Sequence, residues 1–108
     1  MSFQNQFTKT TTDANLMETV HHGSAEYPFR YYYENIALFD FKCIDWHWHS
    51  ELEFIYIKSG NVVFDIGTVH FELNEGNGIM INSKILHRLQ SSSDAIIPNF
   101  LFLSLIHI

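Results

Sequence analysis

Two histidines and a glutamate lie close together in the segment 47–53, HWHSELE. His47, His49 and Glu53 all occupy odd positions, and alternate residues of an extended strand project to the same face. The three side chains could therefore converge on one side of a sheet. Imidazole nitrogens and carboxylate oxygens bind divalent transition metals, and iron, zinc, manganese, nickel and copper all suit such donors. The spacing predicts part of a metal site.

A second segment, Gly76 to His87, can supply a fourth donor. Aromatic residues flank the first segment, so we expect the imidazoles to lie against an apolar wall, where a polar group without a partner costs about 1–3 kcal/mol. A metal ion would satisfy the donors together, and a hydrogen-bonded polar cluster or bound water could also do so. Glu51 shares the odd parity, which leaves two alternatives: it joins the pocket, or a bulge turns it outward.

The composition is that of a single folded domain. The chain has 108 residues, of which 46% are hydrophobic and 16% aromatic, enough to bury a core without disulfides and too apolar for a disordered chain. Its formal charge of −6 repels phosphate backbones, so we expect no DNA binding by this chain alone. Cys43 is the single cysteine and cannot form an intramolecular disulfide, which fits a reducing compartment.

The two ends of the chain differ in character. Residues 1–22 show no sustained periodicity and are expected to form a flexible N-terminal arm, whereas residues 23–108 form the folded domain. The first twelve residues are polar and lack the features of a signal peptide. The longest apolar run, 100–108, is about half the length of a membrane-spanning helix. We therefore expect a cytoplasmic protein with no membrane partner.

The folded part predicts an all-β domain. Runs of aromatic and β-branched residues alternate with turn residues, and no amphipathic helix is evident. Turns every eight to ten residues are typical of a β-sandwich or a small barrel. The expected strands are residues 29–34, 36–41, 52–57, 62–66, 69–73, 79–81, 85–89 and 99–106.

The histidine-rich segment resembles the first sequence motif of the cupin superfamily. The pattern HxHxxxExxxxxxG, which Gly60 closes, matches that motif at every position that defines it. Gly76 and His87 match the first glycine and the metal-ligating histidine of the second motif. Three positions differ from the usual Pro, Gly and Asn of that second motif, namely Asn82, Lys84 and Ser91. All four liganding positions are retained.

Within the cupins, the chain most resembles the sensor domain of AraC-type transcription regulators. The resemblance covers about residues 23–103 and rests on Tyr27-Pro28-Phe29 with the tyrosine run after it, on the segment 46–53 and on the turn at Gly60. Such regulators carry a two-helix-turn-helix DNA-binding module after the cupin, and these 108 residues contain no such module. The resemblance implies the effector-binding half alone.

The resemblance also implies a fold and a set of site residues. The fold would be a single cupin domain over residues 23–108, a double-stranded β-helix or jelly-roll barrel. His47, His49, Glu53 and His87 would point into the barrel and could hold a divalent transition metal. Three further residues could contact a ligand in the pocket: Tyr33, Glu51 and Tyr56.

Two functions follow from these expectations. The first is a sensor domain that binds a small effector, such as a sugar or related metabolite, and forms a homodimer through an exposed last strand, Phe100–Ile108. The alternative is a small stand-alone metal-dependent cupin enzyme, a dioxygenase, isomerase or lyase. Glu51 is the only nearby candidate for its general acid or base.

Overall fold

The computed structural model describes residues 10–18, 29–91 and 93–103. Within these ranges the chain forms strands and two short 3-10 helices, η1 (Ile36–Leu38) and η2 (Asp40–Lys42), and neither helix has the length to cross a membrane. The strands are β1 (Phe29–Asn35), β2 (Cys43–His47), β3 (Leu52–Tyr56), β4 (Asn61–Ile66), β5 (Val69–Asn74), β6 (Gly78–Ile81), β7 (His87–Gln90) and β8 (Ile96–Phe102).

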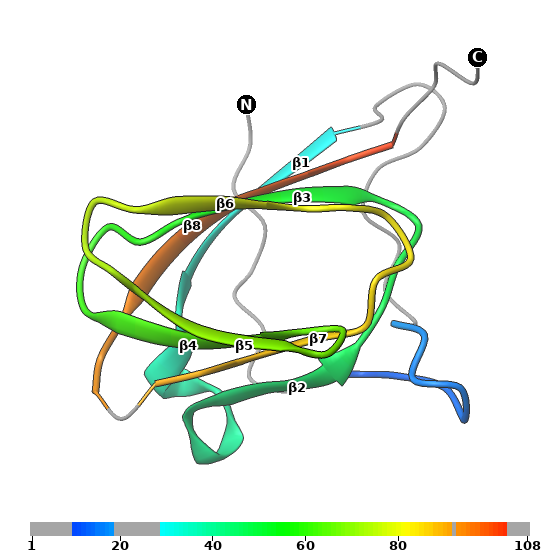
Figure 1. Cartoon of the computed structure of the whole chain (residues 1–108), viewed down its shortest axis with the longest axis horizontal. Coiled ribbons are helices and arrows are strands. Elements are labelled where there is room, and N and C mark those ends of the chain that lie inside the picture. Colours follow the sequence, from blue (N-terminus) through cyan, green and yellow to red (C-terminus); the bar gives the residue numbers. More distant parts are fainter. Residues whose placement is uncertain (1–9, 19–28, 92, 104–108) are drawn as a thin grey trace.

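The strands form two antiparallel sheets of four, in the orders β1-β8-β3-β6 and β2-β7-β4-β5. Figure 1 shows the sheets as two facing layers, with the first above the second. The chain passes from one sheet to the other at almost every connection, and only the β4–β5 hairpin stays within a sheet. Closely spaced strands that alternate between two layers make a jelly-roll barrel.

The core fills the space between the two layers. Alternate residues of β4, Val62 and Phe64, are fully buried, and they meet Ile55 of β3 and Leu89 of β7. The Phe64 ring stacks on that of Phe71 in β5, with 5.7 Å between centroids. Each buried side chain of this size contributes about 1.5–3 kcal/mol. The alternate apolar residues that the sequence predicts on one face of each strand therefore pack against residues of the opposite sheet.

The prediction of a strand over residues 36–41 is wrong. This segment forms η1 and the start of η2 and carries the chain from β1 in one sheet to β2 in the other. The Asn35 side chain accepts a hydrogen bond from the Ala37 amide at 3.0 Å and caps η1, a local bond that competes with strand pairing. Phe41 then has φ +59° and is 99% exposed, which no strand would allow.

The prediction that the last strand lies at an exposed edge is also wrong for the described residues. Strand β8 pairs with β1 on one side and β3 on the other, and Figure 1 shows it between them. The edges of its sheet are β1 and β6. Residues 104–108, the remainder of the predicted pairing strand, lie outside the described residues.

The described part of the N-terminal segment, residues 10–18, packs against the barrel. It forms a parallel bridge between Met17 and Trp48, just after β2. The Glu18 amide donates to the Trp48 carbonyl at 2.8 Å, and the Trp48 amide donates to the Leu16 carbonyl at 3.0 Å. The Trp48 indole donates to the Asn15 carbonyl at 3.0 Å. The boundary at residue 22 stays a prediction, since residues 19–28 lie outside the described ranges.

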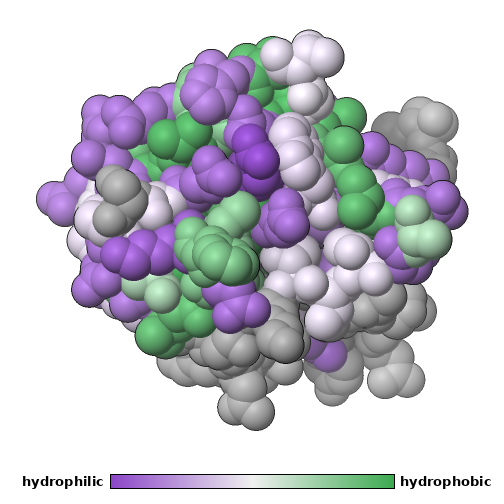
Figure 2. Space-filling view, turned by 90° about the horizontal axis from the view of Figure 1, so that it is seen from below, coloured by the Kyte–Doolittle hydropathy of each residue, from purple (hydrophilic) through white to green (hydrophobic). Residues whose placement is uncertain are grey.

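Figure 2 shows the outer face of the β2-β7-β4-β5 sheet, where hydrophilic and hydrophobic side chains are interspersed. Asp65 of β4 organises a polar cluster there. Its carboxylate accepts hydrogen bonds from Arg88 at 2.8 and 3.2 Å and contacts His70. The Arg88 guanidinium also lies over the Trp46 ring, 4.8 Å from its centroid. This cluster accounts for His70 on the outside of the barrel, away from His47, His49 and His87.

Candidate functional site

Three histidines and a glutamate meet inside one end of the barrel. His47 ends β2 and pairs in register with His87, which begins β7 of the same sheet. Glu53 lies on β3 in the opposite sheet, and His49 lies in the crossover between β2 and β3. The four side chains therefore converge as predicted. They do so from two sheets and the segment that connects them, and not from one face of a single strand.

An irregularity in β2 turns His47 into the barrel. The register between β2 and β7 shifts between Ile44 and His47, as in a β-bulge. Both residues are buried and both line the cavity, although they stand three positions apart and a regular strand would place them on opposite faces. Bulges of this kind commonly re-aim a side chain next to a functional site.

The donor atoms of the four residues lie within 4.8 Å of one another. Glu53 Oε1 is 3.1 Å from Nε2 of His49 and 3.2 Å from Nε2 of His87. Two nitrogen or oxygen ligands of one ion, each bound at about 2.1 Å, are at most about 4.2 Å apart. The widest pair must therefore close by about half an ångström on metal binding, which side-chain rotation supplies.

The backbone orients all three imidazoles toward this shared point. Each ring has its Nδ1 against a carbonyl two residues away in the sequence, at 2.7 Å for His47, 3.0 Å for His49 and 2.7 Å for His87. An Nδ1 that donates to a carbonyl leaves Nε2 directed at the centre of the cluster. Metal-binding histidines are typically held in this way. The donor set and its supports fit a divalent transition metal.

Burial and charge set the protonation of the cluster. Burial, aided by the charge of His87, lowers the pKa of His47 to about 4, so its imidazole is neutral at pH 7. Burial would also lower the pKa of His49, but the hydrogen bond and charge of Glu53 outweigh it and raise that pKa to about 9. Burial opposes ionisation of Glu53, yet the bonds from His49 and His87 hold its pKa well below the usual range. Glu53 is thus a carboxylate, as a metal ligand must be.

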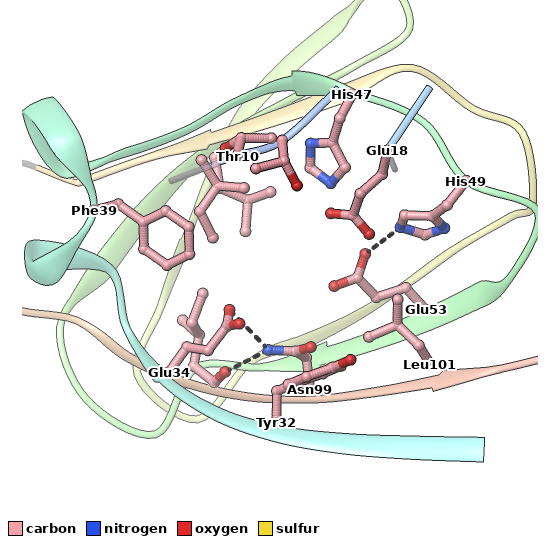
Figure 3. A pocket seen from close by; sticks show the side chains of 14 residues that line it. Thr10, Glu18, Tyr32, Glu34, Phe39, His47, His49, Glu53, Asn99 and Leu101 are labelled. Atoms are coloured by element: carbon pink, nitrogen blue, oxygen red, sulfur yellow. Dashed lines mark hydrogen bonds and ion pairs between the residues drawn. The ribbon is translucent and has the colours of Figure 1, made fainter. Parts of the chain in front are cut away.

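Three residues of the cluster, His47, His49 and Glu53, form one wall of a small cavity. Its volume is about 40 Å³ when measured as the space open to the centres of water molecules. Figure 3 shows His47, His49 and Glu53 on one side together with Glu18, and Glu34 with Asn99 on another. Apolar side chains close the remaining surface, among them Phe39, Ile44, Leu89 and Leu101. The cavity therefore combines metal donors with a separate polar wall.

The three predicted ligand contacts lie outside this cavity. Glu51 is buried, but its carboxylate lies behind His49, 3.7 Å from Nδ1, and does not line the cavity. Tyr33 and Tyr56 are 40% and 39% exposed. The Tyr33 hydroxyl accepts a hydrogen bond from Lys58 at 3.0 Å on the outside of the barrel. The structure thus brings together the four metal donors and places both tyrosines apart from them.

Among the polar lining residues that sequence reasoning missed, three lie on strands, Tyr32, Glu34 and Asn99, and three lie in the N-terminal segment, Thr10, Thr11 and Glu18. Tyr32 and Glu34 of β1 are buried and face the cavity, whereas the odd residue between them faces outward. Asn99 of β8 is 3% exposed and donates to Glu34 Oε2 at 3.4 Å. The signal was the charged residue at position 34: a glutamate on the even parity of an aromatic strand faces either water or a polar cavity.

Glu34 gives the fold a measurable pH dependence. Burial, with a smaller effect from the charge of Glu53, raises the pKa of Glu34 to about 8 from an ordinary value of 4.5. The folded state thus retains a proton that the unfolded state releases, so this group's contribution to stability is complete below pH 4.5 and declines as the pH rises to 8.

We therefore expect Glu34→Gln to become progressively more stable than the parent between pH 5 and pH 8. The difference should grow by about 1 kcal/mol or more, since each unit of pKa shift corresponds to about 1.4 kcal/mol. Urea unfolding at several pH values measures it, with Glu75→Gln in the exposed β5–β6 turn as the control. A difference that stays constant over this range would contradict the assignment.

Comparison with known proteins agrees with this architecture. Residues 39–104 match the family model of the AraC-like ligand binding domain. The chain is 37% identical over 75 residues to the HTH-type transcriptional regulator YdeC of Bacillus subtilis (strain 168), a match that covers 69% of this chain and 26% of that protein. The chain thus spans about a quarter of the length of this relative.

Solved structures share the fold. A cupin-2 domain protein from Shewanella frigidimarina superposes with a TM-score of 0.59 at 14% identity, over 68% of this chain and 69% of that one. The oxalate decarboxylase of Bacillus subtilis, whose structure concerns its Mn(II) centres, matches with a TM-score of 0.54 at 20% identity, over 60% of this chain and 19% of that one. The expected all-β cupin fold is confirmed, and the chain belongs to the family of AraC-like ligand-binding domains.

Proposed function

We propose that this chain is the effector-sensing domain of a longer AraC-type transcription regulator, and that it binds a small molecule and a divalent transition metal in its barrel. The observation that carries the proposal is a cluster of four buried candidate metal donors in an AraC-like ligand-binding domain, three of which, His47, His49 and Glu53, line its cavity. Family membership supports the ligand, and the donor set supports the metal.

In this proposal His47, His49, Glu53 and His87 hold the ion. A bound divalent ion supplies a Lewis acid that attracts oxygen or nitrogen atoms of the effector. The chain itself orients the three imidazoles through backbone carbonyls and excludes bulk water with the apolar part of the cavity wall. The effector would favour one of two states of the domain, and the attached DNA-binding module would respond to that shift.

The proposal extends to partners. The regulator relative supports a DNA-binding module elsewhere in the longer protein, and the effector would be a small polar metabolite, with a sugar as one candidate. We further propose that the protein acts as a homodimer, the commonest symmetric assembly of soluble proteins. Because β8 is interior to its sheet, pairing by strand addition would use the edges β1, β6, β2 or β5.

Metal loading tests the central part of the proposal. Untagged protein stripped with a chelator and then equilibrated with Zn²⁺ or Mn²⁺ should retain one ion per chain by elemental analysis. The loaded protein should also unfold at a higher temperature, because an ion that binds only the folded state stabilises it by mass action. Retention well below one ion, with no rise in Tm, would refute the metal site and leave a purely organic effector pocket.

A further inference from the structure

Apart from two histidines and one tyrosine, the ionisable side chains that line the described cavity are glutamates. Among the described lining residues there is no lysine or arginine, whereas three glutamates line the cavity, Glu18, Glu34 and Glu53. Glu53 faces the histidines, and Figure 3 shows Glu34 across the cavity from them. A ligand that carries a carboxylate would thus meet the carboxyl groups of Glu18 and Glu34 outside the metal donors, and no lysine or arginine among the described lining residues. The composition of the wall favours a ligand that donates hydrogen bonds or carries positive charge.

Asn99 strengthens this preference through its own bonds. A primary amide has two N–H donors and one carbonyl acceptor. The Asn99 amide nitrogen donates to Glu34 Oε2 at 3.4 Å and to the Ile97 carbonyl at 3.0 Å, so both of its donors are engaged. Asn99 can therefore offer only its carbonyl oxygen to a ligand. Glu34 and Asn99 together form an accepting wall on the inside of the β1–β8 pair.

A carboxyl group in this position lacks a cationic partner within the described part of the chain. Glu34 is 8% exposed, and it accepts a hydrogen bond from the neutral side-chain amide of Asn99. A buried carboxylate is stable only when it is paired with a cation or well hydrogen-bonded, and otherwise takes up a proton. The pKa of Glu34, which burial raises to about 8, agrees with this geometry. A bound cation would supply the missing partner.

We propose that the effector of this domain carries a protonated amine, and that the ammonium group binds Glu34 and the Asn99 carbonyl. The proposal rests on the proposed function, since it presupposes that an effector occupies this cavity. The apolar side chains Phe39 and Ile44 line the same space and suit a short hydrocarbon segment. Because the cavity is small, the ligand is a short amine with few carbons and not a polyamine or a peptide.

Three probes of equal length separate charge from shape: 3-amino-1-propanol, 1,3-propanediol and 3-hydroxypropanoate. Each is titrated at pH 7 into the untagged, ¹⁵N-labelled chain, with the Asn99 side-chain amide followed by NMR. We expect the amine to bind at least about tenfold more tightly than the diol, as charge-assisted hydrogen bonds are about twice as strong as neutral ones. The acid should leave the Asn99 amide unshifted.

Glu34→Gln keeps the shape of the side chain and removes its capacity to ionise when a cation binds. It should weaken binding of the amine at least about tenfold and leave binding of the diol within about threefold, so that selectivity disappears. Glu75→Gln removes an exposed carboxyl from the β5–β6 turn and should change neither value. If Glu34→Gln fails to fold, the comparison of the three probes on the parent chain still decides the question.

Several outcomes would overturn the inference. Diol binding that equals or exceeds amine binding would point to a neutral hydroxylated effector such as a sugar, and would leave effector sensing intact. Tighter binding of the acid would point to an anionic effector held by the metal. If none of the three shifts the Asn99 amide, the short-amine class is excluded. The metal-loading experiment reports separately on the proposed function, so the two failures are distinguishable.

Discussion

The His49→Ala variant should bind Zn²⁺ more than about a hundredfold more weakly than the parent chain. Removal of a residue that merely supports a ligand typically lowers metal affinity by 10- to 100-fold, and His49 is itself a candidate ligand. Its loss removes one of four donors and also frees Glu53 Oε1 from the bond at 3.1 Å that helps to place it. Competition with a chromophoric chelator measures the affinity, and elemental analysis measures the retained ion.

His70→Ala is the matched control for this experiment. Like His49, His70 is a histidine of the barrel. Its side chain, however, is 68% exposed and contacts Asp65 on the outside of the sheet. Its removal should leave the metal content and affinity unchanged. Equal metal content in the parent and His49→Ala proteins would show that the ion, if bound, lies elsewhere. A loss in the His70→Ala variant alone would indicate adventitious binding at the exposed histidine.

The Gly60→Ala variant should lose about 3 kcal/mol or more of stability, the largest effect expected for alanine at any glycine that the structure describes. Gly60 has φ +85°, a conformation that costs a residue with a side chain about 1–2 kcal/mol. A Cβ at this position would also lie 2.5 Å from the Asp94 carbonyl oxygen and 3.0 Å from Ala95 Cα. Both are backbone atoms, so neither can rotate away, and the turn itself must move.

Gly67→Ala separates the two contributions. Gly67 has φ +58° in the β4–β5 turn, and no atom lies within 4 Å of the position its Cβ would take. This variant should lose only the conformational part, about 1–2 kcal/mol. Urea midpoints of the parent and both variants measure the difference at one pH and temperature. Equal losses in the two variants would show that the contact with the segment before β8 is unimportant.

Gly60 also illustrates what the sequence could predict. The turn residues around it and the alternation in the two strands after it predicted the β4–β5 hairpin closely, because both signals are local. The reason that a glycine closes the histidine motif is not local. It is the approach of the segment at Asp94 and Ala95, more than 30 positions later in the chain. Only the resemblance to cupins pointed to this position.

The four candidate metal donors lie together as predicted, but by a geometry that the sequence predicted only in part. Strand parity placed His47, His49 and Glu53 on one face, yet a bulge in β2 and the crossover to β3 bring them together. Bulges and crossovers depend on the pairing partner, which a pattern of alternating residues does not contain. The candidate donors could still be identified, because they match the cupin motif at its liganding positions.

Parity was less useful for the tyrosine run of β1. Every residue from 31 to 33 is a tyrosine, so the pattern does not distinguish the inner face from the outer face. The contact with β8 decides which tyrosine faces inward: Tyr33 faces outward beside Lys58, and Tyr32 faces the cavity.

The backbone conformation of Lys84 could not be predicted from the sequence pattern either. This residue has φ +62° where cupins usually have glycine, so the chain keeps the turn and accepts the strain.

The division of the donors between the two layers has a mechanical consequence. Glu53 belongs to the β1-β8-β3-β6 sheet, and His47 and His87 belong to the β2-β7-β4-β5 sheet. An ion bound to all of them would link the two sheets. Its binding free energy would then oppose separation of the sheets at that end of the barrel. On the proposed function, binding or loss of the ion would therefore change the spacing of the two sheets. Amide hydrogen exchange along β3 and β7, with and without the ion, would record it.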